Sequence, residues 1–386
     1  MPMAGTRTIL TVLAAAALAA AWPARAETFT PATTKLLADL KLDAAILAGL
    51  DRELAVPASW IEGARREGLV KVRTTAADPR FARAWGVFEA RYPFLKYEHV
   101  RGIGRERAVV PLMAYKQGTY VSDVVSSIEA LEDEYRKAGA LIDLRELPGY
   151  ANVEAFYTAP DGVAVSYRKQ HYCMTYDPAK QKPSDLPKTW DDLVGDPRWR
   201  NGRVGMAVNV HTWIAPLWGI KGDAWAEGYM DRIFREMKPQ LRKERLAMLP
   251  QLTSLGEFEL GVPITDLIVA VNTARGMSVS FHCPDIVPMT APHMAILKGT
   301  PRLNAAKLFV NWVLSKEGQL AMHWADAHIP VHRDLNRREF VPFPDAVLGK
   351  RFAPQDARVL AKIPEIAKRW QTYWIAGGGA PGGAGD

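Results

Sequence analysis

The strongest constraint on the fold is a regular alternation of short β-type runs with amphipathic helical stretches, which begins at Leu69. The last helix of the first series carries capping-box spacing from Ser126 to Glu129. Strand–helix–strand order indicates an α/β lobe whose parallel sheet is covered by helices. The hydrophobic spacing predicts strands at 69–74, 95–100 and 120–125 and helices at 79–92, 105–116 and 126–137.

The alternation breaks after Asp161, where two β-like runs follow each other without a helix between them. A second strand–helix series then starts at another capping-box-like sequence, Thr189 to Asp192. A chain of 386 residues suits two domains. We therefore predict a discontinuous first lobe (27–177 and 283–376), a second lobe (178–282), and extended segments at 161–177 and 283–292 that cross between them.

Both ends of the chain look separate from these lobes. Arg7, a short apolar run and Ala24-Arg25-Ala26 are typical of a secretory signal peptide, so we expect cleavage after Ala26 and a periplasmic protein. Cleavage lowers the formal net charge from +7 to +5, because it removes two arginines and no acid. We expect 27–67 to be a helical extension packed outside the lobe, and the glycine-rich 377–386 to be disordered.

The composition and the motifs exclude several classes of function. With 48% hydrophobic and 24% charged residues, the chain is an ordinary globular protein. A net charge of +5 without long basic blocks does not favour nucleic acid as a partner. The sequence contains no nucleophile elbow, phosphate-binding loop or zinc-protease motif, and Gly102-Ile-Gly104 lacks the third glycine of a dinucleotide fingerprint. We therefore expect a protein that is not an enzyme and has no cofactor.

The two cysteines, Cys173 and Cys283, are predicted to form a disulfide, as expected for a pair of cysteines in an oxidising compartment. Two alternatives stay open. One is a pair of inert thiols. The other is a zinc site that also uses His171 and His282, although their positions along a strand suit four ligands poorly.

Several short segments, in a characteristic order and spacing, carry a resemblance to a known family: 67–75, 88–94, 123–127, 186–193, 196–199, Gly256-Glu257 and 304–319. Through them the chain, from Glu67 to about Leu335, resembles the periplasmic solute-binding proteins of ABC importers, in the branch that binds ferric iron, thiamine, polyamines and phosphonates. The resemblance implies a two-lobed type II fold, a ligand cleft, and two strands crossing between the lobes, so Cys173 and Cys283 would tie the crossing strands together. It also implies a monomer that docks on an inner-membrane permease.

Ligands of open α/β sheets bind at the carboxyl ends of the strands, where helix N-termini present free N–H groups. This rule predicts that a small organic solute, with anions among the candidates, is held from both lobes. Each candidate also has a structural alternative: capping for the serines, surface charge for the arginines, core packing for Trp213, and complementing a helix dipole for Asp266. The predicted ligand residues are Thr74, Thr75, Arg101, Arg105, Ser126, Ser127, Asn209, His211, Trp213, Thr265 and Asp266.

Three other functions remain as alternatives. The ferric binders that the chain resembles carry adjacent tyrosines shortly after the Gly-Glu motif, whereas residues 256–270 here contain no tyrosine. An iron carrier is therefore the less favoured alternative within the family. A periplasmic enzyme would use His211 with Asp266 or Glu257 as an acid–base pair. A chemosensory protein would bind solute but dock on a receptor.

Overall fold

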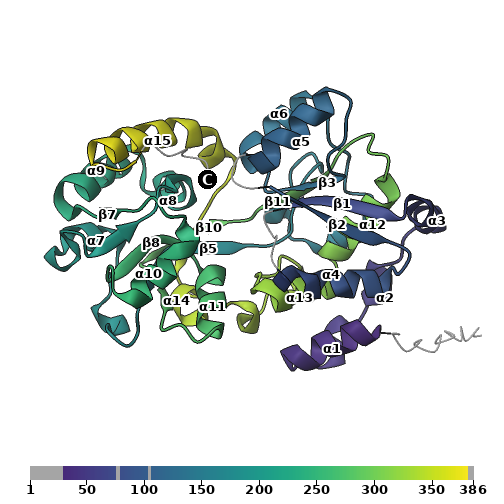
Figure 1. Ribbon diagram of the computed structural model, residues 1–386, viewed down its shortest axis with the longest axis horizontal. Coiled ribbons are helices and arrows are strands. Elements are labelled where there is room, and N and C mark those ends of the chain that lie inside the picture. Colours follow the sequence, from purple (N-terminus) through teal and green to yellow (C-terminus); the bar gives the residue numbers. More distant parts are fainter. Residues whose placement is uncertain (1–28, 75–78, 103–105, 381–386) are drawn as a thin grey trace, which may run out of the picture.

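The structure, a computed structural model, describes residues 29–74, 79–102 and 106–380. The described chain forms two lobes side by side, each with a central sheet and helices on its faces (Figure 1). This arrangement confirms the predicted two-lobed α/β fold. The predicted signal peptide, 1–26, lies outside the described residues. Among the described helices, none is long and apolar enough to cross a membrane.

The first lobe contains a mixed sheet with the strand order β2-β1-β3-β11-β4. β1 runs parallel to β2 and β3, whereas β11 is antiparallel to β3 and β4. Val70 and Val72 of β1 are fully buried, as the alternating pattern predicts. The strands are β1 (Leu69–Thr74), β2 (Lys96–Arg101), β3 (Val124–Ser126), β4 (Val165–Ser166) and β11 (His293–Ile296). The helices are α1 (Pro31–Leu40), η1 (Ala44–Leu47), α2 (Leu50–Glu53), α3 (Ala58–Glu67), α4 (Pro79–Arg91), α5 (Glu106–Lys116), η2 (Glu129–Leu131), α6 (Glu132–Lys137), η3 (Pro148–Asn152), η4 (Ala155–Tyr157), α12 (Leu303–Leu314), α13 (Lys316–Asp326), η10 (Arg333–Leu335) and η11 (Arg338–Phe340).

The second lobe contains a sheet with the order β12-β10-β5-β8-β6-β7, and β9 also pairs with β5. The capping box predicted at Thr189 and Asp192 is confirmed at the start of α7. The strands are β5 (Gln170–Tyr176), β6 (Val204–Met206), β7 (Gln240–Leu241), β8 (Leu260–Thr265), β9 (Ser280–His282), β10 (Ile286–Thr290) and β12 (Arg351–Pro354). The helices are η5 (Pro183–Asp185), α7 (Trp190–Gly195), η6 (Pro197–Trp199), η7 (Val210–Thr212), α8 (Ile214–Lys221), α9 (Asp223–Arg232), η8 (Ile233–Met237), η9 (Leu246–Met248), α10 (Leu249–Leu255), α11 (Asp266–Ala274), α14 (Pro344–Val347) and α15 (Ala357–Ala376).

The chain passes between the lobes at three places. The first passage joins β4 to β5 and the second joins β10 to β11. The third lies at Phe340, which packs in the first core while Val341 packs against the second. The structure therefore differs from the predicted boundary, which assigned all of 283–376 to the hinge and the first lobe. The reason is the apolar stripe of α15: Ile366, Trp370 and Trp374 fill the second core.

The predicted disulfide between Cys173 and Cys283 is present. Its predicted place between the crossing strands is wrong. Both cysteines are fully buried in the second core, where Met174 of β5 pairs with His282 of β9. The bridge therefore joins two segments of one lobe, because β5 and β9 both belong to the second sheet.

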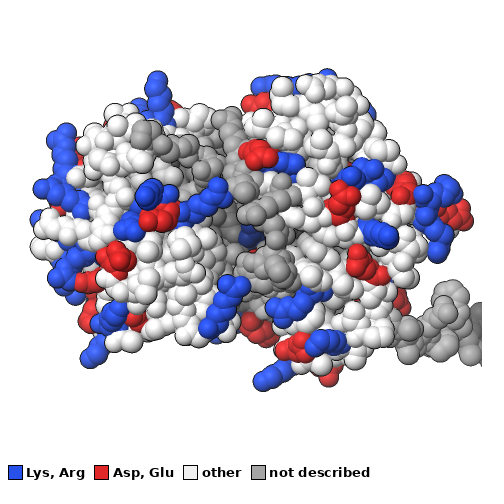
Figure 2. All heavy atoms as spheres, in the orientation of Figure 1, with Lys and Arg blue, Asp and Glu red and all other residues white. Residues whose placement is uncertain are grey.

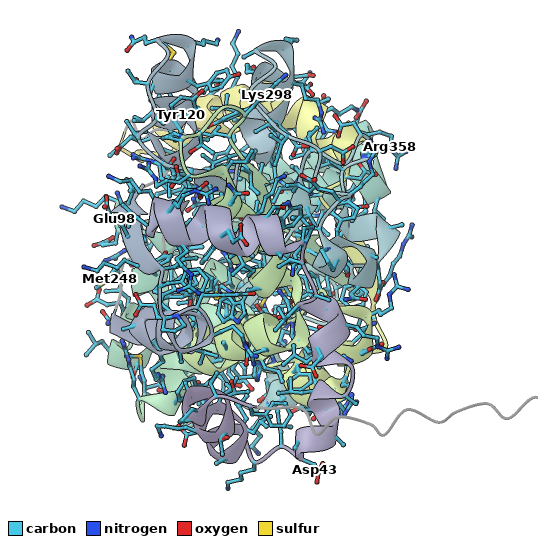
Figure 3. The ribbon with its side chains drawn as sticks, turned by 90° about the vertical axis from the view of Figure 1, so that its right-hand side faces the viewer. Asp43, Glu98, Tyr120, Met248, Lys298 and Arg358 are labelled. Atoms are coloured by element: carbon cyan, nitrogen blue, oxygen red, sulfur yellow. A yellow bond between two sulfur atoms is a disulfide. The ribbon has the colours of Figure 1, made fainter. Side chains whose placement is uncertain are left out.

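The N-terminal extension is helical, as predicted, and packs on the first lobe. Leu36, Leu47 and Leu50 are buried in the first core. Figure 3 looks onto this end of the molecule, with the helices of the extension in front. At the other end of the chain, Gly379 N–H donates to Trp374 O (2.9 Å) and the Trp374 indole donates to Ala380 O (3.0 Å). The start of the tail is thus ordered, in contrast to the prediction, and residues 381–386 lie outside the described part.

Candidate ligand-binding cleft

The two lobes lie side by side in the view of Figure 2, which has the orientation of Figure 1. To the junction between them the first lobe contributes the end of β3 and the first turn of α5, and the second lobe contributes the segment after β6. The positive charge of Arg107, on α5, acts on His211 and on Tyr172, which both belong to the second lobe. These side chains therefore lie near one another where the lobes meet.

Ser127 is the predicted residue that lies most directly at this junction. Its backbone has a left-handed conformation (φ 54°), and its N–H donates to His293 O (2.6 Å). The Ser127 hydroxyl lies 3.4 Å from the Tyr167 hydroxyl, and Arg107 Nε donates to Ser127 O (3.1 Å). Ser127 thus connects the end of β3 to α5 and to the passage between the lobes.

The capping box predicted at Ser126 and Glu129 is wrong. Ser126 is the last residue of β3, and its buried hydroxyl donates to Arg73 O (3.0 Å). The Glu129 carboxylate accepts a hydrogen bond from His293 N–H. The left-handed turn at Ser127 delays the helical conformation until η2, so the two side chains bind other parts of the chain.

The start of β5 brings several polar side chains to one side of the strand. Arg168, Gln170 and Tyr172 are two residues apart, so they point to the same face. Arg168 donates to the Gln170 side-chain oxygen, and Gln170 Nε2 donates to Tyr172 Oη (2.8 Å) and Thr290 Oγ1 (3.1 Å). The Arg168 guanidinium also lies 5.5 Å from the Tyr167 ring centroid. The passage into the second lobe therefore carries a hydrogen-bonded cation.

The groups around these arginines are neutral. Burial raises the pKa of Tyr172 to about 12, against the opposing effects of Arg168 and Arg107. Burial, assisted by the charge of Arg107, lowers the pKa of His211 to about 4. At neutral pH the tyrosine is a phenol and the histidine is an uncharged imidazole, so neither supplies a counter-charge to the two guanidinium groups. Asp326 acts on Arg168 and Asp266 acts on Tyr172 only from a distance.

The other predicted residues lie at the carboxyl ends of their strands, and most are engaged with the protein itself. Thr74 O accepts hydrogen bonds from Gly102 N–H (3.2 Å) and from His99 Nε2 (3.1 Å). Thr265 caps α11, its hydroxyl accepting from Ile268 N–H (3.2 Å). Asn209 O accepts from Thr212 Oγ1 (2.8 Å). Their part in ligand binding stays a prediction.

Trp213 and Asp266 occupy places that do not support the predicted contacts with solute. The Trp213 ring is fully buried, with Trp190, Tyr229 and Trp370 around it. Asp266 is also fully buried, and its carboxylate lies 2.6 Å from His171 Nδ1 and accepts from Leu267 N–H (2.9 Å). Core packing accounts for the Trp213 ring, although its Nε1 has no hydrogen-bond partner among the described residues, and a histidine partner accounts for Asp266.

Thr75 and Arg105 lie outside the described residues, and so does the side chain of Arg101. The Arg101 backbone ends β2, opposite Thr74 of β1. These three predictions stay untested.

The acid–base pair considered for an enzyme is not assembled. Asp266 is bound to His171, and Glu257 is half exposed with Arg242 as its nearest cation (4.0 Å). His211 Nδ1 is buried and has no hydrogen-bond partner within the described part of the chain.

The side chains that the sequence did not identify are Arg107, Tyr167, Arg168, Gln170 and Tyr172. Arg107 follows Arg101 and Arg105 in the same arginine-rich segment, so the sequence contained a signal that could have identified it. The other four lie where the chain passes between the lobes and at the beginning of β5. A rule that searches only the carboxyl ends of strands cannot find them.

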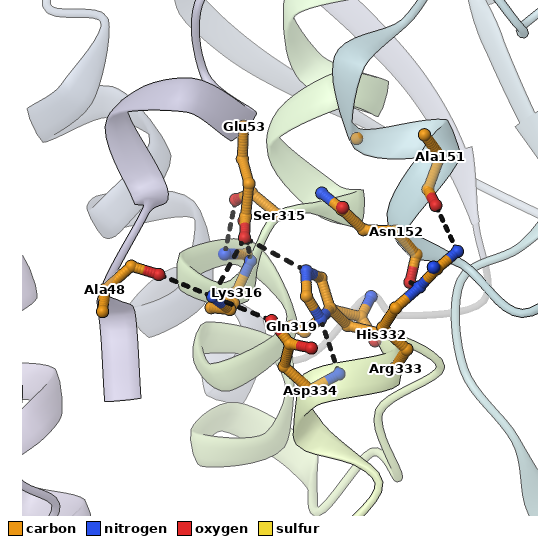
Figure 4. A network of polar contacts seen from close by, with 12 residues as sticks. Ala48, Glu53, Ala151, Asn152, Ser315, Lys316, Gln319, His332, Arg333 and Asp334 are labelled. Atoms are coloured by element: carbon orange, nitrogen blue, oxygen red, sulfur yellow. Dashed lines mark hydrogen bonds and ion pairs between the residues drawn. The ribbon is translucent and has the colours of Figure 1, made fainter. Parts of the chain in front are cut away.

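One group of residues could in principle hold a metal ion, and it lies in the first lobe (Figure 4). Glu53, His332 and Asp334 offer ligand atoms within 4.8 Å of one another. The ammonium group of Lys316 already lies among them, 3.3 Å from Glu53, 3.0 Å from Asp334 and 2.7 Å from Ala48 O. His332 Nδ1 accepts from Asp334 N–H (3.2 Å), which leaves the proton on Nε2, directed at Glu53 (3.2 Å). This cluster therefore serves to join the N-terminal extension to α13.

Solved structures share the fold at low sequence identity. Iron-bound HitA from Pseudomonas aeruginosa has a TM-score of 0.61 and 17% identity, over 78% of this chain and 99% of that one. An ABC transporter substrate-binding protein from Bradyrhizobium japonicum has a TM-score of 0.65 and 18% identity (79% and 99%). AfuA from Actinobacillus pleuropneumoniae, with bound fructose-6-phosphate, has a TM-score of 0.58 and 18% identity (80% and 98%).

Sequence comparison supplies the family. No curated protein matches the chain. Residues 129–346, more than half of the chain, match the model of a family described as bacterial extracellular solute-binding protein. This match agrees with the two lobes and with the polar junction between them. The chain is therefore a member of the bacterial extracellular solute-binding protein family.

Proposed function

We propose that the protein captures a small polar organic solute between its lobes and delivers it to an inner-membrane ABC permease. It would act as a monomer in the periplasm, after cleavage behind Ala26. The family and the fold support this role. The observation that carries it is a pair of buried polar atoms at the junction, Arg168 Nε and His211 Nδ1, which have no hydrogen-bond partner among the described residues. Buried polar atoms without partners are rare unless a ligand or water satisfies them.

Binding in such a site works by population shift. The lobes have separate cores, and the segments between them are short, so the lobes can rotate as bodies about those segments. A solute that touches both lobes binds the closed form more tightly and shifts the population toward it. The permease then distinguishes the closed, loaded protein from the open one. No bond in the solute is made or broken.

A thermal-unfolding screen of the full mature chain tests this function. The screen should contain organic acids, phosphonates, sugar phosphates, polyamines, thiamine and metal salts. A true ligand at 100 times its Kd stabilises the folded state by about 2.7 kcal/mol, which gives a clear increase in Tm. Absence of any stabilising compound would contradict solute capture. Chemical change of a stabilising compound would instead support the enzyme alternative.

Iron is tested in the same screen. Two of the similar structures hold iron, HitA and the Trichodesmium FutA complex with iron and citrate. In this chain Tyr172 Oη accepts from Gln170 and Tyr167 Oη lies beside Ser127, so the tyrosines of the junction already have protein partners. We expect ferric salts to give no phenolate charge-transfer band, and such a band would favour the iron carrier.

A further inference from the structure

Arginines elsewhere in the protein show how this chain treats a buried guanidinium group. Arg91 lies 2.6 Å from Glu317, Arg302 lies 2.7 Å from Asp123, and Arg73 lies 2.9 Å from Glu106. All three side chains are less than one fifth exposed. Each has a carboxylate because a buried charge without a counter-charge is costly.

Arg107 and Arg168 depart from this pattern. Within the ranges that the structure describes, no carboxylate lies within 4.0 Å of either guanidinium group. Arg107 donates to the Ser127 carbonyl, and Arg168 donates to the Gln170 side chain, so both have only neutral acceptors. The charge of Asp326 acts on Arg168 from beyond ion-pair distance, and Asp326 also lies 3.7 Å from His328. Two positive charges at the junction are thus not neutralised by direct contact.

The described side chains in direct contact with the two arginines offer hydrogen bonds but no negative charge, and the carboxylates of Asp326 and Asp266 act only from farther away. Tyr167, Tyr172 and Ser127 present hydroxyl groups, and His211 presents an uncharged imidazole. Arg168 Nε remains a buried donor without an acceptor in the described chain. Arg107 binds Ser127, the Ser127 hydroxyl lies 3.4 Å from Tyr167 Oη, and the Arg168 guanidinium lies 5.5 Å from the Tyr167 ring centroid, so the two guanidinium groups are linked through one short chain of contacts. An anion placed there would satisfy both charges.

We propose that the solute carries an oxyanion, a carboxylate or a phosphoryl group, and that Arg107 and Arg168 bind it between the lobes. This inference rests on the proposed function and specifies its substrate class. Guanidinium groups suit either oxyanion, because their paired N–H donors match two oxygens of one planar or tetrahedral group. Arg107 belongs to the first lobe and Arg168 to the passage into the second, so one anion bound by both would favour the closed form.

The test compares charged probes with uncharged counterparts on the full mature chain, at constant ionic strength. Fructose-6-phosphate is paired with fructose, citrate with its triamide and benzoate with benzamide, and inorganic phosphate is used alone. At least one oxyanion should raise the Tm of the wild type while its uncharged counterpart does not. A response to fructose-6-phosphate or inorganic phosphate alone indicates a phosphoryl ligand. A response to citrate or benzoate alone indicates a carboxylate ligand.

Variants then assign the effect to the two arginines. Arg107→Gln and Arg168→Gln should each weaken binding of the responding probe about 10- to 100-fold, as expected for loss of a charged hydrogen-bonding partner. Arg358→Gln removes an equal charge from an exposed side chain that pairs with Asp356, and should leave binding unchanged. If a glutamine variant does not fold, Arg107→Lys or Arg168→Lys keeps the charge and loses the paired donors, and should still weaken binding.

The outcomes separate this inference from the proposed function. A neutral compound, polyamine or metal that stabilises the wild type and both glutamine variants equally would keep solute capture and overturn the oxyanion site. An oxyanion that binds the variants as well as the wild type would also overturn it. Failure of every compound in the full screen to stabilise the wild type would overturn the proposed function itself.

Discussion

The two lobes have the same layered architecture but are stabilised by different chemistry. In the first lobe, each buried carboxylate binds an arginine or a lysine: Glu53 with Lys316, Asp123 with Arg302, Glu132 with Arg136 and Glu317 with Arg91. In the second lobe, the core contains a disulfide and a group of buried tryptophans, Trp190, Trp213, Trp370 and Trp374. Both lobes have large apolar cores, to which the first lobe adds buried pairs of carboxylates with arginine or lysine and the second adds a disulfide.

The difference follows from how each lobe is assembled. The carboxylates of the first lobe join segments that are far apart in the chain: Glu317 on α13 binds Thr33, at 2.5 Å, and Arg91 on α4. Such specific pairs fix which segments meet. In the second lobe, α15 returns from the far end of the chain and packs through its apolar stripe. Apolar packing provides most of the stability there, and the disulfide limits the freedom of the unfolded chain.

Removing the disulfide should have the largest effect. In a Cys173→Ala, Cys283→Ala double variant, the closed loop of 110 residues is released, and the free energy of unfolding should fall by about 4–5 kcal/mol. Urea unfolding followed by tryptophan fluorescence measures this, because most of the described tryptophans lie in the second lobe. Reduced wild type should match the variant. If the fluorescence and circular-dichroism transitions lose the same free energy of unfolding, the lobes unfold as one unit. That result would contradict a separate role of the disulfide in the second lobe.

The first lobe should be most sensitive at Glu317. This carboxylate is fully buried and accepts hydrogen bonds from Arg91, Thr33 and the Trp312 indole (2.9 Å). Glu317→Gln keeps the shape but leaves Arg91 without its counter-charge, which should cost about 3–5 kcal/mol in urea unfolding. The control is Glu365→Gln, which removes the partner of Arg369 on the exposed side of α15 and should give no measurable change. A Glu317 variant as stable as that control would contradict the role of charge pairs.

Two histidines, one in each lobe, should contribute to stability with opposite dependence on pH. Burial, against the hydrogen bond to Pro187 O, lowers the pKa of His282 in the second lobe to about 4. The unfolded chain takes up a proton near pH 6.5 and the folded lobe does not, so stability is full above that pH and falls as the pH drops toward 4. In the first lobe, burial tends to lower the pKa of His293. The hydrogen bond and the charge of Glu132 outweigh burial, so the pKa of His293 is raised. That contribution is full below pH 6.5 and is lost as the pH rises through the raised pKa.

Urea unfolding at pH 7 and at pH 4.5 measures the contrast. The fluorescence transition of the wild type should lose about 1–3 kcal/mol at the lower pH for each of the two second-lobe histidines with a pKa of about 4, His282 and His211, so His282→Gln should remove about half of the loss. His293→Gln serves as the matched control, because it should leave the pH dependence of the second lobe unchanged. A His282 variant with the wild-type pH dependence would place the acid sensitivity elsewhere.

Several features that depend on residues close together in the sequence were predicted correctly. The strand at 69–74 and the helix starting at Thr189 follow from patterns within a few positions, and both agree with the structure. The disulfide was predictable because only two cysteines exist. The destination of α15 was not predictable, since an apolar stripe shows which face is buried but not which lobe buries it.

The candidate site was predicted less completely, for a related reason. Ser127 and His211 were found because they follow strands, and Arg168 and Tyr172 were missed because they lie where a strand begins. Trp213 was selected for its chemistry, but its surroundings place it in the core. Whether an aromatic or charged side chain faces solute depends on contacts with distant segments, and local patterns do not contain that information.

The smallest expected effect compares two helix starts that look alike in sequence. Thr189→Ala removes the hydroxyl that accepts from Asp192 N–H (3.1 Å), which should cost about 1 kcal/mol and speed hydrogen exchange in the first turn of α7 about 5-fold. Ser126→Ala removes only a bond to Arg73 O in the sheet, so exchange at the start of α6 should not change. Hydrogen-exchange mass spectrometry of both variants resolves the two helices. Faster exchange in α6 of the Ser126 variant would mean that Ser126 caps that helix in solution, and that the left-handed turn at Ser127 is not fixed.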